Sequence, residues 1–341
     1  MSVTIKDIAK LAEVSTSTVS RCLNNNTRIS VATRTRVKKI ADELGFVPNN
    51  SAKSLSTKKT GLIGLVYQES LDFDGSRSYI DSLFINLRHE LERLQMDTIQ
   101  VEAINTHTHE SNAIRLIKEN KIDGFLFLHT QITPDDLKAL NTYDIPAVQV
   151  HFAPQFTDLK RLDYFISDNF YGGYIAAQHL IEKNCRKTLL LRSSPNIGSE
   201  YDDRTDGFIK AYSDQNLSVD KNLIFEIKCD VATAYEFTLN HLDIIKTCDS
   251  IFAQADVLAV GMIQALKSVG INVPTDIKVV GFDDSYYSRL LPPFITTIHQ
   301  PREEISKKAI KRIKDLISKG DVEELVQEEI KPYLIERESS K

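Results

Sequence analysis

The chain has 341 residues, which at about 150 residues per domain predicts two or three domains. Its balance of hydrophobic and charged residues is that of a globular protein and excludes a disordered chain, a collagen or a coiled-coil rod. No apolar run reaches the roughly 18 residues of a membrane span, and the first residues lack the pattern of a secretory signal. We therefore expect no membrane partner and a cytoplasmic location. The four cysteines lie far apart, so we expect no zinc site, no disulfide framework and no cofactor.

The charge is unevenly distributed along the chain. The formal net charge is −5, which by itself argues weakly against a nucleic-acid partner. Residues 1–60, however, hold eleven Lys and Arg against four Asp and Glu, a net charge of +7. The remaining residues hold 31 basic and 43 acidic side chains, a net charge of −12. A basic head on an acidic body indicates that the head alone approaches a polyanion, although a solvated N-terminal face is the alternative.

The head predicts three short helices, over residues 5–11, 16–23 and 31–44. Thr4, Ser15 and Ser30 stand where N-cap residues belong, and Gly45 stands where a glycine commonly ends a helix. Apolar residues recur at helical spacing in each segment, which predicts one buried face per helix. These are Ile5, Ile8, Ala9 and Leu11 in the first, Val19, Cys22 and Leu23 in the second, and Val37, Ile40, Ala41 and Leu44 in the third.

The second helix leaves Thr16, Ser17, Ser20 and Arg21 facing outward. A short helix with a small polar face and one arginine, following a tight turn, is typical of a helix-turn-helix, whose second helix fits the DNA major groove. A generic three-helix bundle is the alternative. Such a bundle has no need for a second helix that is rich in Ser and Thr and has Arg21 as its one charged residue.

Two segments, TIKDIA at residues 4–9 and VSTSTVSRCLN at residues 14–24, resemble the DNA-binding head of the lactose-repressor (LacI/GalR) family. The similarity continues through residues 33–37 and 41–49. The resemblance implies that Thr16, Ser17 and Arg21 read bases, since an Arg can clamp guanine and Ser or Thr can contact either type of base. It assigns phosphate contacts to Thr4, Ser15, Thr18, Ser20, Asn24 and Arg34. Cys22 replaces the family's usual aliphatic residue, and we interpret it as a core residue.

The polar, basic stretch 48–60 has a flexible tether as its simplest interpretation. This stretch also resembles the hinge helix of the family, which forms on operator DNA and inserts a leucine into the minor groove. Ala52 and Leu55 match that pattern, whereas Ser51 departs from it where an apolar residue is usual. Asn49 and Lys53 complete the hinge contacts that we expect, and Lys53 would follow the phosphates.

Strands and helices alternate after Gly61, which predicts an α/β fold of doubly wound parallel sheets. With the resemblance, the fold class is a helix-turn-helix head on a two-lobed body like a type I periplasmic binding protein. We expect a DNA-binding domain at 1–47, a hinge at 48–60, and an effector-binding and dimerisation domain at 61–341. Its N-lobe is expected at about 61–163 and 296–322, and its C-lobe at about 164–295 and 323–341.

Ligands of open α/β sheets bind at the carboxyl ends of the strands, which in a two-lobed body predicts a site between the lobes. Asp283 follows a buried strand and is a candidate acceptor for a ligand hydroxyl, with Asp284 as a turn residue beside it. The resemblance makes Arg204 the effector-gripping arginine, and an ordinary ion pair with Asp202 or Asp203 is the alternative. The remaining candidates are Gln68, Asp256 and Ser167. Ala255 departs from the family, where an Asn is common.

No nucleotide-binding glycine motif, nucleophile elbow or metal-binding histidine motif occurs, so we expect no enzyme. We expect a regulator, with repression as the default, that binds a pseudo-palindromic operator in double-stranded DNA as a homodimer. A small effector, a sugar or sugar derivative, would bind between the lobes and shift their arrangement. The need for a corepressor protein stays open. A transport-type sugar-binding protein and a sugar-metabolising enzyme are the rivals, and the head argues against both.

Overall fold

The structure is a computed structural model that describes residues 3–23, 26–46, 59–68, 77–151, 153–154, 162–193, 200–319 and 324–341. The chain divides into two compact units, Met1–Thr60 and Gly61–Lys341. Each is described by itself below, the first as the head and the second as the body. No helix in the described residues is both long enough and apolar enough to cross a membrane.

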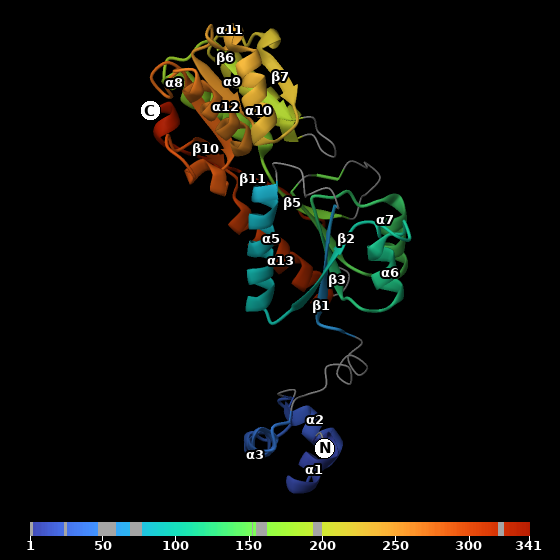
Figure 1. Ribbon diagram of the computed structural model, residues 1–341. Helices are drawn as coiled ribbons and strands as arrows, with labels where there is room; N and C mark the ends of the chain where they lie inside the picture. The colour runs from blue at the N-terminus through green and yellow to red at the C-terminus, as the bar shows by residue number, and fades with distance from the viewer. Residues whose placement is uncertain are drawn as a thin grey trace. The chain divides into compact units, whose positions relative to one another are not determined.

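In its described residues the head contains three helices, α1 (Ile5–Leu11), α2 (Thr16–Leu23) and α3 (Val31–Glu43), drawn in blue in Figure 1. Each begins at an expected cap. Thr4 donates from its backbone N (2.9 Å) and its Oγ1 (2.7 Å) to the Asp7 carboxylate. Thr18 N donates to Ser15 Oγ at 3.1 Å, which satisfies an amide that would otherwise lack a partner. Gly45 follows α3 with a φ of +63°, a conformation that glycine adopts without strain.

The core of the head comes from all three helices. The buried residues are Ile8, Ala9, Ala12, Val19, Cys22, Val37 and Ala41, with Ile5, Leu23, Ile40 and Leu44 partly buried against them. Cys22 is fully buried, as a core residue should be. The expected stripe on α1 is wrong at Leu11, whose exposed fraction is 59%. Ala12, just beyond the helix, takes the buried position instead.

The body holds two six-stranded sheets, one in each lobe. The first-lobe sheet has the order β11 (Gln327–Ile330), β5 (Asp163–Ser167), β4 (Ala147–His151), β3 (Gly124–Leu128), β1 (Leu62–Tyr67) and β2 (Asp97–Glu102), all parallel. The second-lobe sheet has the order β12 (Tyr333–Ile335), β10 (Thr296–His299), β9 (Lys278–Asp283), β8 (Ser250–Ala253), β6 (Thr188–Ser193) and β7 (Ile224–Ile227). Only β12 in that sheet is antiparallel to its neighbour.

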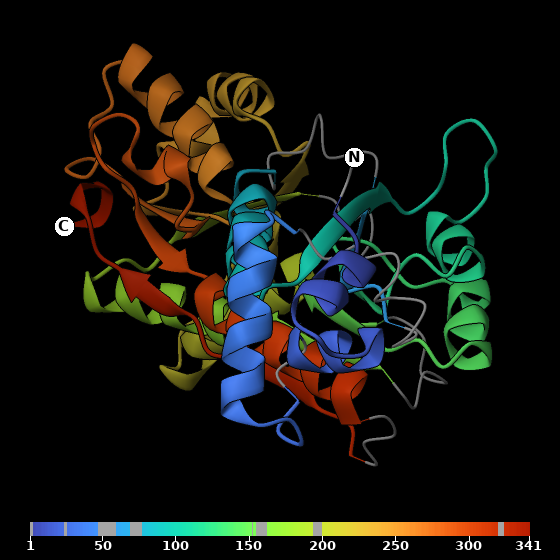
Figure 2. The same ribbon diagram turned by 90° about the horizontal axis from the view of Figure 1, so that it is seen from below.

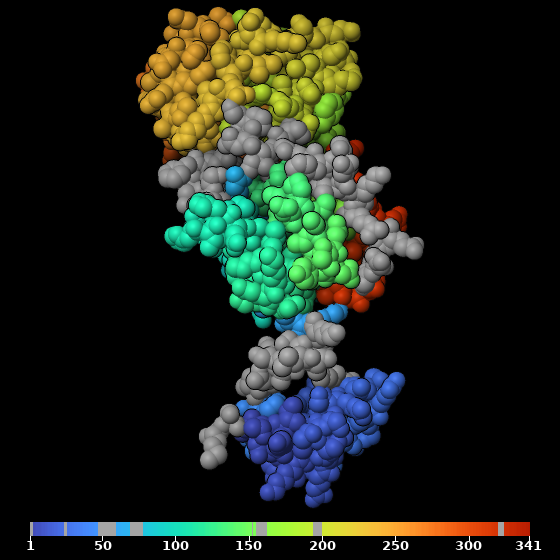
Figure 3. Space-filling model, turned by 90° about the vertical axis from the view of Figure 1, so that its right-hand side faces the viewer, coloured from blue at the N-terminus to red at the C-terminus, as the bar shows by residue number. Residues whose placement is uncertain are grey.

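Helices cover both faces of the first-lobe sheet. Helices α5 (Arg77–Arg93) and α13 (Arg302–Lys319) lie side by side on one face, as Figure 1 shows, and Figure 2 gives the view from below. Helices α6 (Asn112–Lys118) and α7 (Pro134–Thr142) cover the other face and form part of the surface in Figure 3. Successive side chains of β3 alternate between the two cores, which is why this strand is apolar throughout.

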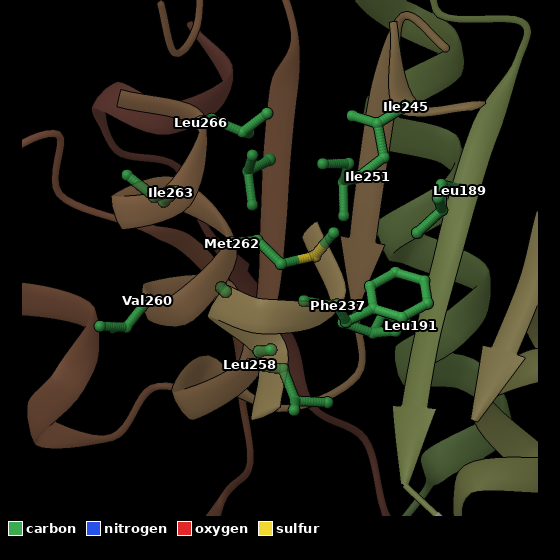
Figure 4. Packing of buried hydrophobic residues seen from close by; sticks show 14 of the residues in the cluster. Leu189, Leu191, Phe237, Ile245, Ile251, Leu258, Val260, Met262, Ile263 and Leu266 are labelled. Carbon is green, nitrogen blue, oxygen red and sulfur yellow. The ribbon is translucent and has the colours of Figure 1, made fainter. Parts of the chain in front are cut away.

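The second-lobe sheet is covered in the same way. Helices α8 (Asn169–Glu182) and α9 (Glu200–Asp214) pack on one face. Helices α10 (Val231–Asn240) and α12 (Asp256–Ser268) pack on the other, with the short α11 (Leu242–Ile245) after α10. Figure 4 shows Met262 and Phe237 reaching from these helices toward Leu191 and Ile251 of the sheet. Both lobes are therefore three-layered α/β structures.

The predicted lobe boundaries need three corrections. The strand at 163–167 is β5 of the first lobe, because it pairs with β4 from Val148↔Asp163 onward. The strand at 296–299 is β10 of the second lobe, paired with β9. The segment from 323 onward, expected in the C-lobe, begins with β11, which pairs with β5 and so belongs to the first lobe. Alternation along the sequence shows where strands occur, but it does not show which sheet each one joins.

The chain consequently passes between the lobes three times, after β5, after β10 and after β11. The C-terminal residues then return to the second lobe. Ser339 Oγ donates to the carbonyl of Val279 at 2.6 Å, and Ser340 Oγ donates to Thr296 Oγ1 at 2.7 Å. Both serines are fully buried, so the end of the chain is part of that lobe's structure.

Candidate functional site

Helix α2 has a polar outer face and an apolar face that packs in the core of the head. Val19 and Cys22 are fully buried, while Thr16, Ser17 and Arg21 are exposed. The helix period places these two sets on opposite sides, so core packing fixes the direction of the polar face. An exposed Arg beside two small hydroxyl side chains has the donor and acceptor groups that base edges in a major groove require.

Hydroxyl groups at the start of α2 bond to one another. Ser15 Oγ lies 2.8 Å from Ser17 Oγ and 2.9 Å from Thr18 Oγ1. Thr18 and Ser20 are half-buried, and so is Arg34 on α3, whereas Thr4 and Ser15 are exposed. The phosphate contacts expected of these five residues remain predictions. Asn24, Asn49, Ala52, Lys53 and Leu55 lie outside the described residues.

The second group of candidates follows the carboxyl ends of the parallel strands in the body. In the first lobe Gln68 follows β1, His129 follows β3, and His151 and Ser167 end β4 and β5. In the second lobe Gln254 follows β8, Asp283 ends β9, and Gln300 follows β10. Parallel strands bring their carboxyl ends to one edge of a sheet, so each lobe gathers polar side chains at one edge.

A hydrogen bond between the lobes brings these two edges together, because Arg302 Nη1 at the start of α13 donates to the Asp283 carbonyl at 2.9 Å. Tyr79 lies on α5 of the first lobe and is fully buried. Burial raises its pKa, the Asp283 carboxylate of the second lobe raises it further, and Arg204 opposes the shift. Burial also lowers the pKa of His151, and Arg204 adds to that effect. We call the residues around these groups the inter-lobe site, defined by Tyr79, His129, His151, Arg204, Gln254, Asp283 and Gln300.

Arg204 is held at the inter-lobe site by neutral groups. Its Nε donates to Asn169 Oδ1 at 2.9 Å, and its Nη1 donates to the Gln254 carbonyl at 2.6 Å. Its guanidinium carbon lies 3.8 Å from the ring centre of Phe282. The alternative, an ion pair with Asp202 or Asp203, does not hold: Asp202 pairs with Arg192, and Arg204 donates to an amide and a carbonyl oxygen. Arg204 is therefore a buried, oriented cation.

Asp283 is fixed in an unusual backbone conformation. Its φ is +111°, which costs a residue with a side chain about 1–3 kcal/mol and persists only where the surroundings impose it. Gln300 Nε2 donates to its Oδ1 at 2.7 Å, and Arg302 Nη1 donates to its carbonyl at 2.9 Å. The carboxylate lies at the inter-lobe site, as the sequence predicted from its position after a buried strand.

Asp284, the next residue, belongs to an ion cluster rather than to the edge of the site. Its carboxylate accepts hydrogen bonds from Arg289, Arg337 and His299. Burial alone would raise its pKa, but these three partners lower it well below the ordinary value. With a φ of +49° it also forms the turn after β9. This agrees with its interpretation as a turn residue.

Asp256 is fully buried at the start of α12, and its carboxylate bonds within the second lobe. Its Oδ2 accepts from Ser285 N at 2.7 Å, and its Oδ1 accepts from Thr297 Oγ1 at 2.6 Å. Burial raises its pKa well above the ordinary value, and the nearby Asp283 adds to the shift. These bonds position the strand ends that hold Asp283. Direct contact between Asp256 and an effector remains a prediction.

Several buried polar atoms, four at strand ends and one on α5, have no hydrogen-bond partner among the described residues. They are Gln68 Oε1, Tyr79 OH, Ser167 Oγ, Gln254 Oε1 and Gln300 Oε1. Buried polar atoms are nearly always hydrogen-bonded, and each exception requires an explanation. A bound molecule with its own donors and acceptors would supply one. Gln68 and Ser167, both predicted from the sequence, belong to this set.

The sequence analysis missed five residues of the inter-lobe site: His129, His151, Gln254, Gln300 and Tyr79. The first four stand at or just after the end of a buried strand, as Asp283 does. Applying that rule to every strand would have found them. Tyr79 lies on a helix and carries no such signal. In the described part of the chain, no group of three or more His, Cys, Asp or Glu side chains is arranged to hold a metal ion.

A three-helix head with an exposed polar helix, followed by a two-lobed α/β body, defines a DNA-binding regulator with a ligand-binding type of domain. Residues 4–49 match the family described as bacterial regulatory proteins, lacI family. Residues 177–340 match the periplasmic binding protein-like domain. The HTH-type transcriptional repressor PurR of Aliivibrio fischeri (strain MJ11) is 30% identical over 344 residues, covering 98% of each chain. The chain belongs to the lacI family of bacterial regulatory proteins.

Solved structures agree with this assignment over the whole chain. The transcriptional regulator CelR in complex with cellobiose is 25% identical, with a TM-score of 0.70, and the match covers 99% of this chain and 100% of that one. The lac repressor dimer bound to operator and the anti-inducer ONPF has a TM-score of 0.77 at 21% identity, covering 100% of this chain and 99% of that one. The latter shows a shared fold. The family consists of transcriptional regulators.

Proposed function

We propose that this protein is a cytoplasmic repressor that binds a pseudo-palindromic operator as a homodimer and is controlled by a small hydroxylated effector, a sugar or sugar derivative. The effector binds between the lobes and changes the affinity for the operator. The observation that carries the DNA-binding part is the exposure of Thr16, Ser17 and Arg21 opposite the buried Val19 and Cys22. The lac repressor match, a dimer on operator, supports the homodimer.

The polar strand ends carry the effector part of the proposal. The inter-lobe site combines a cation, Arg204, with a carboxylate, Asp283, and with amide and hydroxyl groups. The partnerless atoms around them need both donors and acceptors from whatever binds. A molecule with several hydroxyl groups supplies both kinds at close spacing. The match to CelR, whose structure is a complex with cellobiose, supports a carbohydrate effector.

Coupling between the effector and DNA follows from the three passages of the chain between the lobes. A ligand that contacts both edges stabilises one arrangement of the lobes over another. A difference of a few kcal/mol in its affinity for the two arrangements is enough to switch the operator affinity. Whether binding releases or strengthens the repressor, and whether a corepressor protein takes part, stays open.

A gel-shift titration of Arg21→Ala tests the assignment of the reading helix. On an operator obtained by binding-site selection, we expect a loss of about 1–3 kcal/mol and relaxed preference at one base pair of each half-site. Lys39→Ala is the matched control, because it removes one exposed positive charge from α3. It should weaken binding to all duplexes equally. Unchanged operator affinity and base preference in Arg21→Ala would contradict the assignment.

A thermal-shift screen of neutral and acidic sugars with the full-length chain tests the effector site. The wild type should be stabilised by at least one sugar, and Asp283→Ala should lose that shift. Asp206→Ala removes a carboxylate from the exposed face of α9 and should keep it. If a sugar stabilises the wild type and Asp283→Ala equally, the inter-lobe site is not where it binds.

A further inference from the structure

One buried histidine stands where the chain leaves the second lobe for the first. His299 ends β10 of the second-lobe sheet, and α13, which packs in the core of the first lobe, begins three residues later at Arg302. Its Nδ1 lies 2.9 Å from Asp284 Oδ2, and its Nε2 lies 3.2 Å from Glu303 Oε2. Asp284 follows β9 in the second lobe and Glu303 lies on α13. A single imidazole therefore connects the two lobes.

The two partners restrict the charge that this imidazole can carry. Both are carboxylates, and an ionised carboxylate only accepts hydrogen bonds. A neutral imidazole has one N–H group and can donate to only one of them, so the other carboxylate would face the lone pair of a ring nitrogen. The imidazolium has two N–H groups and donates to both. Only the charged form of His299 therefore connects Asp284 with Glu303.

Charged and titratable groups reach His299 from every element around it. They are Asp283 and Asp284 at the end of β9, Arg289 of the short helix η3 (Tyr286–Arg289), Tyr333 of β12, Arg337 after β12, and Arg302 and Glu303 of α13. The ring of Tyr333 stacks on that of His299 with centroids 4.6 Å apart. Burial lowers the pKa of His299, but its hydrogen bonds to the two carboxylates outweigh burial and the charge of Arg302, and raise it above the ordinary value. The charged form is therefore present at low pH and is lost as pH rises through the raised pKa.

Loss of the proton breaks the bond to Glu303 and keeps the bond to Asp284. The Asp284 carboxylate is buried and also accepts hydrogen bonds from Arg289 and Arg337, so it stays in place beside the imidazole. The Glu303 side chain is 59% exposed, so it can turn into water and remain solvated. Its bond to His299 is also the longer of the two. Deprotonation therefore removes the bond that joins the lobes.

Arg302 makes a second connection at the same crossing, one that does not titrate. Its Nη1 donates to the Asp283 carbonyl at 2.9 Å, and its Nη2 donates to the Asp284 carbonyl at 3.1 Å. These bonds fix the position at which α13 begins relative to the second lobe. A helix held at one point can still change its direction, whereas a second contact, from Glu303 to His299, also fixes that direction. The charge on His299 therefore acts on the angle between α13 and the second lobe.

We propose that His299 is a pH-sensitive connection between the lobes, which in its charged form holds α13 in one direction relative to the second lobe and in its neutral form releases it. Because α13 packs against the first-lobe sheet, a change in its direction changes the arrangement of the lobes. The consequence for DNA rests on the proposed function, in which this arrangement sets the operator affinity. A change in pH then acts on the same equilibrium as the effector.

Pulsed electron paramagnetic resonance on the full-length chain tests the proposal by measuring a distance between the lobes. Lys118→Cys on α6 and Gln178→Cys on α8 place one spin label at an exposed position of each lobe, and the four native cysteines are buried. Spectra are recorded from about pH 6 to about pH 9. We expect one narrow distribution of distances at low pH and a broader or shifted one at high pH, with a midpoint above about pH 6.5.

Two variants in the labelled chain have opposite expected results. His299→Gln is neutral at every pH and should show the high-pH distribution throughout. Glu303→Gln should keep the narrow distribution throughout, because an amide can accept from the imidazolium and, turned over, donate to the neutral imidazole. Its exposed side chain also keeps the test valid if His299→Gln fails to fold. His107→Gln, at an exposed position of the first lobe, is the control and should behave as wild type.

The outcomes separate this inference from the function on which it rests. A wild-type distribution that does not change with pH, or one that changes equally in Glu303→Gln, would overturn the proposal. Gel shifts on the selected operator should show an affinity that changes about fivefold or more over this pH range in the wild type and less in both variants. If the distance between the lobes follows pH but the operator affinity does not, His299 connects the lobes as proposed and the coupling of their arrangement to DNA is contradicted.

Discussion

The contact between α8 and α9 permits a sharp test of how the fold positions Arg204. The two helices approach so closely that glycines are required on both. A Cβ at Gly173 would lie 1.9 Å from the backbone carbonyl oxygen of Arg204, and one at Gly207 would lie 1.9 Å from that of Phe170. Contacts of real Cβ atoms essentially never fall below 3.0 Å, so either substitution must push the helices apart by about 1 Å or more.

Two opposing effects determine how much Gly173→Ala lowers the free energy of unfolding. Overpacking of a rigid core typically costs about 1–3 kcal/mol. We expect the upper end of that range here, because the added Cβ meets the backbone of the other helix, which cannot rotate away as a side chain can. Alanine is better than glycine inside a helix by about 1 kcal/mol, which offsets part of that cost. We therefore expect a net loss of about 2 kcal/mol. For a body of this size that lowers Tm by roughly 3 °C.

The assay is differential scanning calorimetry of the full-length chain, followed by titration with an effector found in the sugar screen. Displacing α9 also moves Arg204, so the effector affinity should fall as well as Tm. Gln178→Ala, at an exposed position of the same helix, is the matched control and should stay within about 0.5 kcal/mol of wild type. An unchanged or higher Tm in Gly173→Ala would show that the helices separate freely, and the reasoning would be refuted.

Three further predictions concern other parts of the molecule. Asp284→Asn should lower the free energy of unfolding in urea by about 3 kcal/mol, since the buried carboxylate binds three cationic side chains; a loss below about 1 kcal/mol would contradict the ion cluster. Burial lowers the pKa of His299, but hydrogen bonds to the Asp284 and Glu303 carboxylates raise it above its ordinary value overall. Charged His299 therefore stabilises the body below about pH 6.5, and this contribution is lost as pH rises through the raised folded-state pKa. The urea midpoint should fall from about pH 6 to about pH 8 in the wild type and fall less in His299→Gln; equal falls would exclude this group. Ser30→Ala removes the α3 cap, and hydrogen exchange of its first amides should become about fivefold faster, corresponding to about 1 kcal/mol.

The three described helices of the head could be predicted from the sequence, because they are specified by local signals. Caps at Thr4, Ser15 and Ser30, a glycine at position 45 and apolar residues at helical spacing all act within a few residues. Leu11 is the exception, and it shows the limit of such signals. Apolar residues at helical spacing predict which face of a helix is buried. Packing against the other helices decides which residues along that face are buried.

The body was predictable in its α/β class but not in how its strands divide between the sheets. β5, β10 and β11 are assigned by pairing with distant strands, which no local pattern records. The candidate site residues divide in the same way, into those marked by a local pattern and those that depend on strand pairing. Asp283 could be predicted because it directly follows an apolar run, whereas His129 and His151 gain their meaning only when β3 and β4 become neighbours.

The most direct test of the whole account is a binding-site selection with the full-length chain on a pool of random duplexes. The account predicts that a single pseudo-palindromic family of sequences is enriched, with two half-sites in successive major grooves. It also predicts that Arg21→Ala loses one conserved base pair in each half-site while Lys39→Ala loses none. If no duplex is enriched over the starting pool, the exposed face of α2 does not read DNA, and the central claim fails.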